Sequence, residues 1–178
     1  MPADAQTFLQ GMVGAIFVFA AVGKVVSRAS VAPLLLAAGG PPRIVRALAP
    51  LVPLVELVIG GAVLTGLFLS VPGACAVSLV FVWVQARSRR RDAQVACNCF
   101  GRLDLIVPQS VPAAHAVLLA LASAALLTGT PGAPPSASEP LAAGAATGVT
   151  AILGSLLLGT AWEFRRRRAT VLSEGARA

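Results

Sequence analysis

Two cysteines separated by a single residue carry the clearest chemical potential in this sequence. Cys97 and Cys99 lie in the segment Cys-Asn-Cys-Phe-Gly, with four arginines upstream between residues 87 and 91 and Arg102 downstream. Thiols this close can form only a small, strained disulfide ring, and strain makes a disulfide easier to reduce. Nearby positive charge favours the thiolate, which is the attacking species in disulfide exchange. The pattern predicts a redox-active pair; a metal site and two inert interfacial cysteines remain as alternatives.

The other reactive side chains are few. His115 is the only histidine, and it lies shortly after the cysteine segment. It could act as a base for a thiol, complete a Cys97/Cys99/His115 site for Cu(I) or Zn, or hydrogen-bond to the loop without chemistry. Cys75 lies about one membrane thickness earlier along a helix, so we expect it to be a buried thiol that cannot pair with Cys97. We expect no cofactor and no resident metal.

One carboxylate lies within an apolar stretch. Glu56 follows Pro53 by three residues, and Lys24 lies near the end of the preceding apolar block. A carboxylate inside a membrane is costly and faces the bundle interior or water, and a long lysine side chain could reach it. A structural ion pair, a protonated acid and a proton or ligand site are all compatible with this pattern. We also expect Pro53 to kink its helix.

Hydrophobic blocks must position these residues. The chain has 178 residues, of which 57% are hydrophobic and 12% charged, with a mean hydropathy of +0.84. Soluble domains carry about 25% charged residues, and a membrane-spanning helix needs about 20 residues. We therefore predict a single integral membrane domain, an all-α bundle of about five transmembrane helices. The expected helices cover residues 8–26, 47–69, 71–86, 113–127 and 141–164, and a basic tail covers residues 165–178.

The distribution of basic residues predicts the topology. All 14 lysines and arginines lie around the loops that follow the first, third and fifth blocks or in the C-terminal tail. Under the positive-inside rule the N-terminus is outside, and the C-terminus and the Cys97/Cys99 loop are cytoplasmic. The net charge of +7 is explained by helix orientation and contact with the lipid bilayer, so we expect no nucleic acid partner. The small-residue pair Gly144 and Gly148 is compatible with a homodimer.

Three segments together resemble a known family. They are residues 20–24 (AAVGK), residues 51–60 (LVPLVELVIG) and residues 97–101 (CNCFG). The set resembles the MauE family of methylamine-utilisation membrane proteins, part of the wider DoxX-like group. The family often has an arginine near the start of the fourth helix, where this chain has His115.

The resemblance implies a protein of the bacterial inner membrane with four core helices and a fifth added. It implies redox-associated thiol–disulfide handling, with Cys97 and Cys99 as the redox pair and Lys24 and Glu56 as intramembrane polar positions. The implied partners are a thioredoxin-like protein or a client redox enzyme.

We therefore expect a membrane thiol–disulfide redox protein that supports maturation of a partner redox enzyme. Whether it is an enzyme, a thiol–disulfide oxidoreductase, stays open. The alternatives are a non-catalytic membrane assembly factor and a carrier of metal or small solutes that uses Glu56, Cys97, Cys99 and His115.

Overall fold

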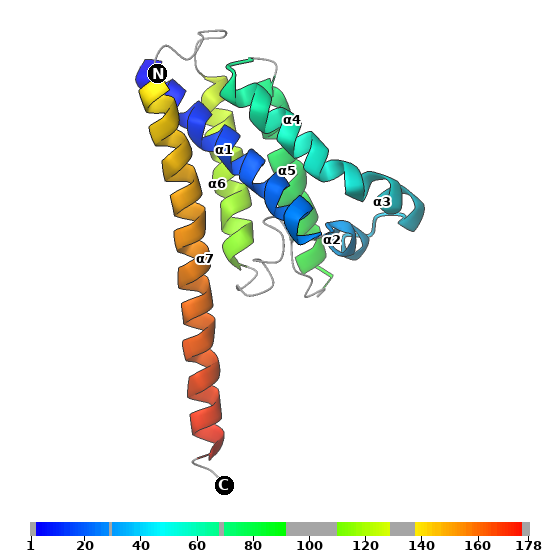
Figure 1. The fold of residues 1–178 in the computed structure, drawn as a ribbon. Helices are drawn as coiled ribbons and strands as arrows, with labels where there is room; N and C mark the ends of the chain where they lie inside the picture. The colour runs from blue at the N-terminus through cyan, green and yellow to red at the C-terminus, as the bar shows by residue number, and fades with distance from the viewer. Residues whose placement is uncertain (1–2, 29, 68–69, 92–109, 129–137, 176–178) are drawn as a thin grey trace.

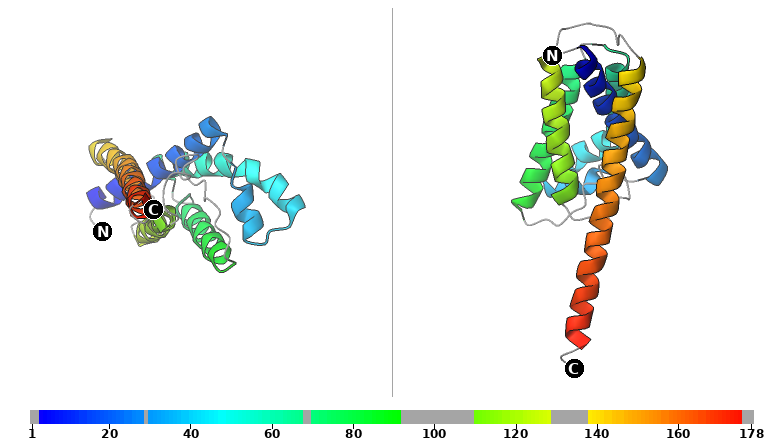
Figure 2. Two further views of the ribbon diagram at one scale, coloured as in Figure 1. Left: turned by 90° about the horizontal axis from the view of Figure 1, so that it is seen from below. Right: turned by 90° about the vertical axis from the view of Figure 1, so that its left-hand side faces the viewer.

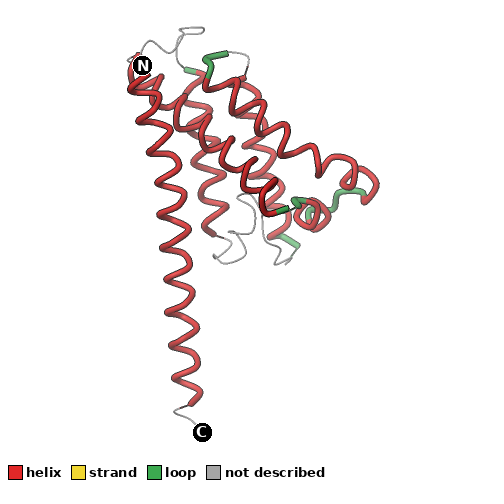
Figure 3. The backbone as a smooth tube through the Cα atoms, in the orientation of Figure 1, coloured by secondary structure: helices red, strands yellow, loops and turns green. Residues whose placement is uncertain are grey.

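The chain folds into helices throughout the part that the structure describes. The computed structural model describes residues 3–28, 30–67, 70–91, 110–128 and 138–175, and these ranges contain no strand (Figure 3). The helices are α1 (Ala3–Ser27), α2 (Ala32–Ala37), α3 (Pro42–Leu48), the 3-10 turn η1 (Ala49–Leu51), α4 (Val52–Leu64), α5 (Ser70–Arg89), α6 (Ser110–Leu127) and α7 (Ser138–Gly175).

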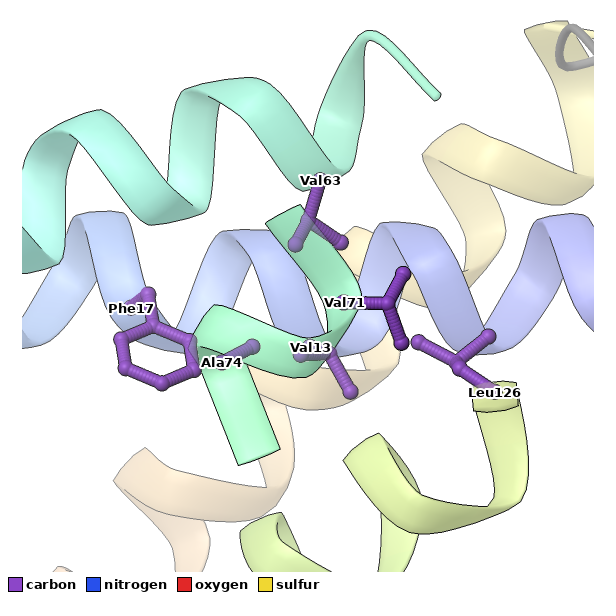
Figure 4. Close-up of a cluster of buried hydrophobic side chains, with 6 residues drawn as sticks. All are labelled: Val13, Phe17, Val63, Val71, Ala74 and Leu126. Atoms are coloured by element: carbon purple, nitrogen blue, oxygen red, sulfur yellow. The ribbon is translucent and has the colours of Figure 1, made fainter. Parts of the chain in front are cut away.

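Helix α1 is the centre of the arrangement. It runs obliquely across the bundle and packs against α4 and α7, while α5 and α6 form a second closely packed pair (Figures 1 and 2). The principal cluster of buried apolar side chains joins α1, α4, α5 and α6 (Figure 4). It consists of Val13, Phe17, Val63, Val71, Ala74 and Leu126.

The outer surface of the bundle is apolar, as a lipid-facing surface must be. Large side chains such as Val25, Val58, Leu118 and Leu158 are more than 60% exposed. In water such a surface would be unfavourable, but against lipid chains it costs nothing. Among the described residues, three helical segments are long and apolar enough to cross a membrane: Ala3–Ser27, Pro42–Leu64 and Ser70–Arg89. Residues 113–127 form a shorter apolar helix, so the all-α, multi-pass membrane bundle is confirmed.

The helices alternate in direction. The chain starts at the upper end of the bundle in Figure 1, where α4 and α6 also end. Helices α1 and α5 end at the lower end, and α6 begins there (Figure 1). Lys24, Arg28, Arg87 and Arg91 belong to this lower end, which we call the basic end. The alternation is the one that the basic-residue pattern predicts.

Two helices are longer than the apolar sequence blocks from which they were predicted. The first expected helix, residues 8–26, begins at Ala3 because polar residues continue it; Gln6 and Thr7 are buried, and the Thr7 hydroxyl donates to the Ala3 carbonyl. The fifth expected helix, residues 141–164, extends to Gly175 and takes in most of the expected basic tail. Arginine, alanine and leucine are good helix formers, so the helix does not end where hydropathy falls.

The second block is shifted relative to the expected residues 47–69. Its helical segment begins at Pro42 and ends at Leu64, where the turn at Gly66 has a positive φ of 76°. A break in α-helical geometry is present close to the expected kink at Pro53, but it lies in the turn before the proline, at η1. Pro53 itself lies in the first turn of α4, where a missing N–H costs no helical hydrogen bond.

Candidate functional site

Lys24 and Glu56 form a buried ion pair between α1 and α4. The Lys24 Nζ lies 2.8 Å from both Glu56 carboxylate oxygens, and each residue is 2% exposed. Lys24 lies in the last turn of α1, and Glu56 lies in α4 one turn after Pro53. The two side chains depend on each other, since removing one leaves the other buried and unpaired in a medium that cannot solvate it.

A third helix contributes an aromatic ring to the pair. The Lys24 Nζ lies 5.7 Å from the centre of the Phe81 ring on α5, a distance at which a ring face attracts a cation. The close approach of α1 and α4 depends on Gly60, one turn after Glu56. A Cβ atom at Gly60 would lie 2.9 Å from the Gly14 carbonyl oxygen, so a side chain there would push the two helices apart. The ion pair thus sits where three helices meet.

Buried polar residues continue from the ion pair towards the basic end. Gln85 and Ser88 lie one and two turns after Phe81 and therefore on the same face of α5. They are 6% and 2% exposed, and both make polar interactions. Our sequence reasoning missed Phe81, Gln85 and Ser88. The available signal was the spacing of Gln85 and Ser88, which lie three residues apart and therefore on one face of a helix.

The cysteine pair falls on the connection between α5 and α6. Cys97 and Cys99 lie outside the described residues, so the structure gives no geometry for them. Helix α5 ends and α6 begins at the basic end, the end at which α1 carries Lys24 (Figure 1). Both attachment points of the cysteine segment therefore lie at the same end of the bundle as the ion pair.

The remaining candidate residues lie at different ends of the bundle. His115 is half-buried near the start of α6 and makes an interaction there. Cys75 is a half-buried free thiol near the start of α5, at the opposite end from the attachment points of the Cys97/Cys99 segment. Among the described residues, no group of three or more histidine, cysteine, aspartate or glutamate side chains could hold a metal ion. Two members of the alternative Cys97/Cys99/His115 site lie outside that range.

The small-residue pair of α7 packs within the chain. A Cβ atom at Gly144 would overlap the Phe8 carbonyl oxygen of α1, and one at Gly148 would lie 3.0 Å from the Met12 carbonyl oxygen. Gly11 of α1 meets α7 in the same way, at Leu141. This motif therefore does not indicate a homodimer, because its close-packing face is already covered by α1.

Comparison with known proteins identifies the family. The family described as "Methylamine utilisation protein MauE" matches residues 3–130, which include every helix from α1 to α6 and the cysteine segment. No curated protein and no solved structure matches the chain. The chain belongs to the MauE family, and α7 lies outside the matched part.

Proposed function

We propose that this MauE-family membrane protein supports the maturation of a partner redox enzyme by thiol–disulfide exchange through Cys97 and Cys99. The observation that carries the proposal is the pair itself, two thiols one residue apart in a basic segment that the family match includes. Membership of the family associates the chain with methylamine utilisation at a membrane. The exchange chemistry is our inference from the residue types.

The chemistry needs only the two thiols and a disulfide in the partner. One thiolate of the pair attacks a partner sulfur; the partner S–S bond breaks, a mixed disulfide forms, and the released partner sulfur takes up a proton. The second thiolate then attacks the mixed disulfide, which yields a Cys97–Cys99 disulfide and a second partner thiol. Two electrons have moved to the partner, and a dithiol protein of the thioredoxin-like class returns the pair to its reduced state.

Lys24 and Glu56 act as positioning residues in this proposal. Their ion pair fixes the last turn of α1 against α4, and the contact with Phe81 joins α5 to both. Helix α5 leads into the cysteine segment, so the pair supports the bundle end from which that segment starts. His115, near the start of α6, follows the same segment and is a candidate base for one of the thiols.

The proposed location is the bacterial inner membrane, with the N-terminus outside and the C-terminus in the cytoplasm. The alternation of helix directions supports this orientation, because it gathers the basic residues at one end of the bundle (Figure 1). The cysteine segment then faces the cytoplasm, where thioredoxin-like reductants are available.

Redox-state trapping tests the proposal in the living cell. Cells are quenched with acid, free thiols are labelled with a large maleimide, and the chain is followed in a Cys75→Ser background. We expect Cys97 and Cys99 to become unavailable to label after a disulfide-forming oxidant and to recover when the oxidant is removed. A pair that stays fully labelled throughout would refute exchange, and the non-catalytic assembly factor would become the better account.

A further inference from the structure

A groove opens at the basic end between the α2–α3 segment and the last turns of α5. Its volume is about 390 Å³, and its lining is largely apolar, with Leu35, Ile44 and Leu48 on one side and Val84 on the other. Ile44 and Leu48 are each more than half exposed, so the groove is open on its outer side. Trp83 completes the wall and is 59% exposed, and tryptophan at such a position is typical of the membrane–water interface.

Two arginines stand at the rim of this groove, Arg87 in α5 and Arg91 two residues after that helix ends. The Arg87 Nε donates a hydrogen bond of 2.9 Å to the Ala38 carbonyl, and its guanidinium lies 5.5 Å from the centre of the Trp83 ring. Arg91 follows one turn later, and its guanidinium lies against Gly39. Gly39 has a φ of 91°, and a Cβ atom there would overlap that guanidinium, so the glycine makes room for it.

The rim therefore carries two positive charges above an apolar floor. Within the described residues, neither Arg87 nor Arg91 is paired with a carboxylate. A guanidinium offers several donors in a fixed plane that match phosphate oxygens, and Arg87 uses only its Nε on Ala38. An apolar floor beneath two guanidinium groups that no described carboxylate neutralises is complementary to a molecule with an anionic head and a hydrocarbon chain.

We propose that this groove binds an anionic phospholipid, with its phosphate between Arg87 and Arg91 and an acyl chain along Ile44 and Val84. The bilayer surrounding the bundle supplies this ligand at high local concentration, and anionic lipids are attracted to basic residues at helix ends. The lipid would tie α2 and α3 to α5 in addition to the Arg87–Ala38 hydrogen bond. This site is separate from the ion pair and does not depend on the proposed thiol exchange.

Trp83 allows the site to be tested by fluorescence. The chain has two tryptophans, so the full-length Trp162→Phe variant reports on Trp83 alone. It is reconstituted in phosphatidylcholine vesicles that contain brominated phosphatidylglycerol or, at the same mole fraction, brominated phosphatidylcholine. Bromine quenches tryptophan only at close range. We expect the anionic lipid to quench Trp83 at several-fold lower mole fraction than the neutral lipid, with the preference persisting at high salt.

Matched variants distinguish lipid binding in the groove from a general attraction of anionic lipid to the basic end. Arg91→Gln should abolish most of the preference, because the Arg91 guanidinium lies against Gly39 in the groove wall. Arg90→Gln removes the same charge from the neighbouring position, but Arg90 is neither a lining residue of the groove nor one of the nearest contacts of Gly39, so this variant should leave the preference intact. Arg87→Lys keeps the charge but loses the planar donor and should weaken the preference partly. Equal quenching by both lipids in the parent protein, or equal loss in Arg90→Gln and Arg91→Gln, would overturn the proposal.

Discussion

At the scale of single residues, charged side chains within hydrophobic blocks of the sequence were the features that predicted a contact. Glu56 and Lys24 could be paired from sequence because each interrupts a hydrophobic block and a lysine side chain is long enough to join them. Phe81 could not be placed, because nothing in an apolar helix marks which face turns towards another helix. The packing of α5 on α4 selects that face, and it is a property of the assembled bundle.

The ion pair gives a prediction about stability. Lys24→Met or Glu56→Met alone leaves a buried charge without its partner and should destabilise the protein by about 3–5 kcal/mol. The double variant removes both charges and should be closer to the parent protein than either single variant. Thermal unfolding in detergent measures all four proteins of the cycle. Additive losses would show that the two side chains do not stabilise each other.

The same double variant distinguishes positioning from proton transfer. If the pair only holds α1 against α4, the folded double variant should retain the redox cycling of Cys97 and Cys99. Loss of cycling in a double variant with parent-like unfolding would instead assign a chemical role to the Lys24–Glu56 pair.

At the scale of elements, hydropathy located the helices but not their ends. Apolar runs identify the part of a helix inside the bilayer, whereas a helix continues as long as its residues tolerate helical geometry. Helix α7 shows the difference most clearly: its 38 residues span about 57 Å, against about 30 Å for the hydrocarbon core. Figure 2 shows it extending well beyond the other helices at the basic end.

The α1–α7 crossing gives a prediction with a matched control. Gly144→Ala places a methyl group on the Phe8 carbonyl and should cost about 1–3 kcal/mol through overpacking. Gly154→Ala, on the same helix, meets no described atom within 4 Å and should be neutral or gain about 0.5–1 kcal/mol from helix propensity. Unfolding midpoints in detergent report both. Equal effects would mean that α7 does not pack on α1 through Gly144.

At the scale of the whole molecule, the order of helices and their alternation could be predicted, and the packing partners could not. Basic residues indicate which loops share a side, because insertion follows charge. They carry no information on whether α1 lies at the centre or the edge. That position follows from small residues such as Gly11, Gly14 and Gly60, which allow α4 and α7 to approach the α1 backbone.

Orientation in the membrane is a prediction at this scale. Paired reporters, one active outside and one active in the cytoplasm, fused after Leu67 and Glu139 should read as external, and fusions after Arg91 and Ala178 should read as cytoplasmic. Arg91 lies at the basic end of the bundle, and Ala178 follows α7, which runs towards that same end; the positive-inside rule places this end in the cytoplasm. An external signal at Arg91 would reverse the orientation and place the cysteine segment outside the cytoplasm.

The central claim is that Cys97 and Cys99 exchange disulfides with a partner protein, and capture of the mixed disulfide tests it most directly. In a Cys75→Ser background, Cys97→Ser and Cys99→Ser are expressed separately, quenched with acid and separated on non-reducing gels. We predict that one single variant accumulates a reducible adduct, since its resolving thiol is absent, and that the variant lacking both cysteines forms none. The absence of an adduct from both single variants, together with normal function of the variant lacking both cysteines, would contradict the account.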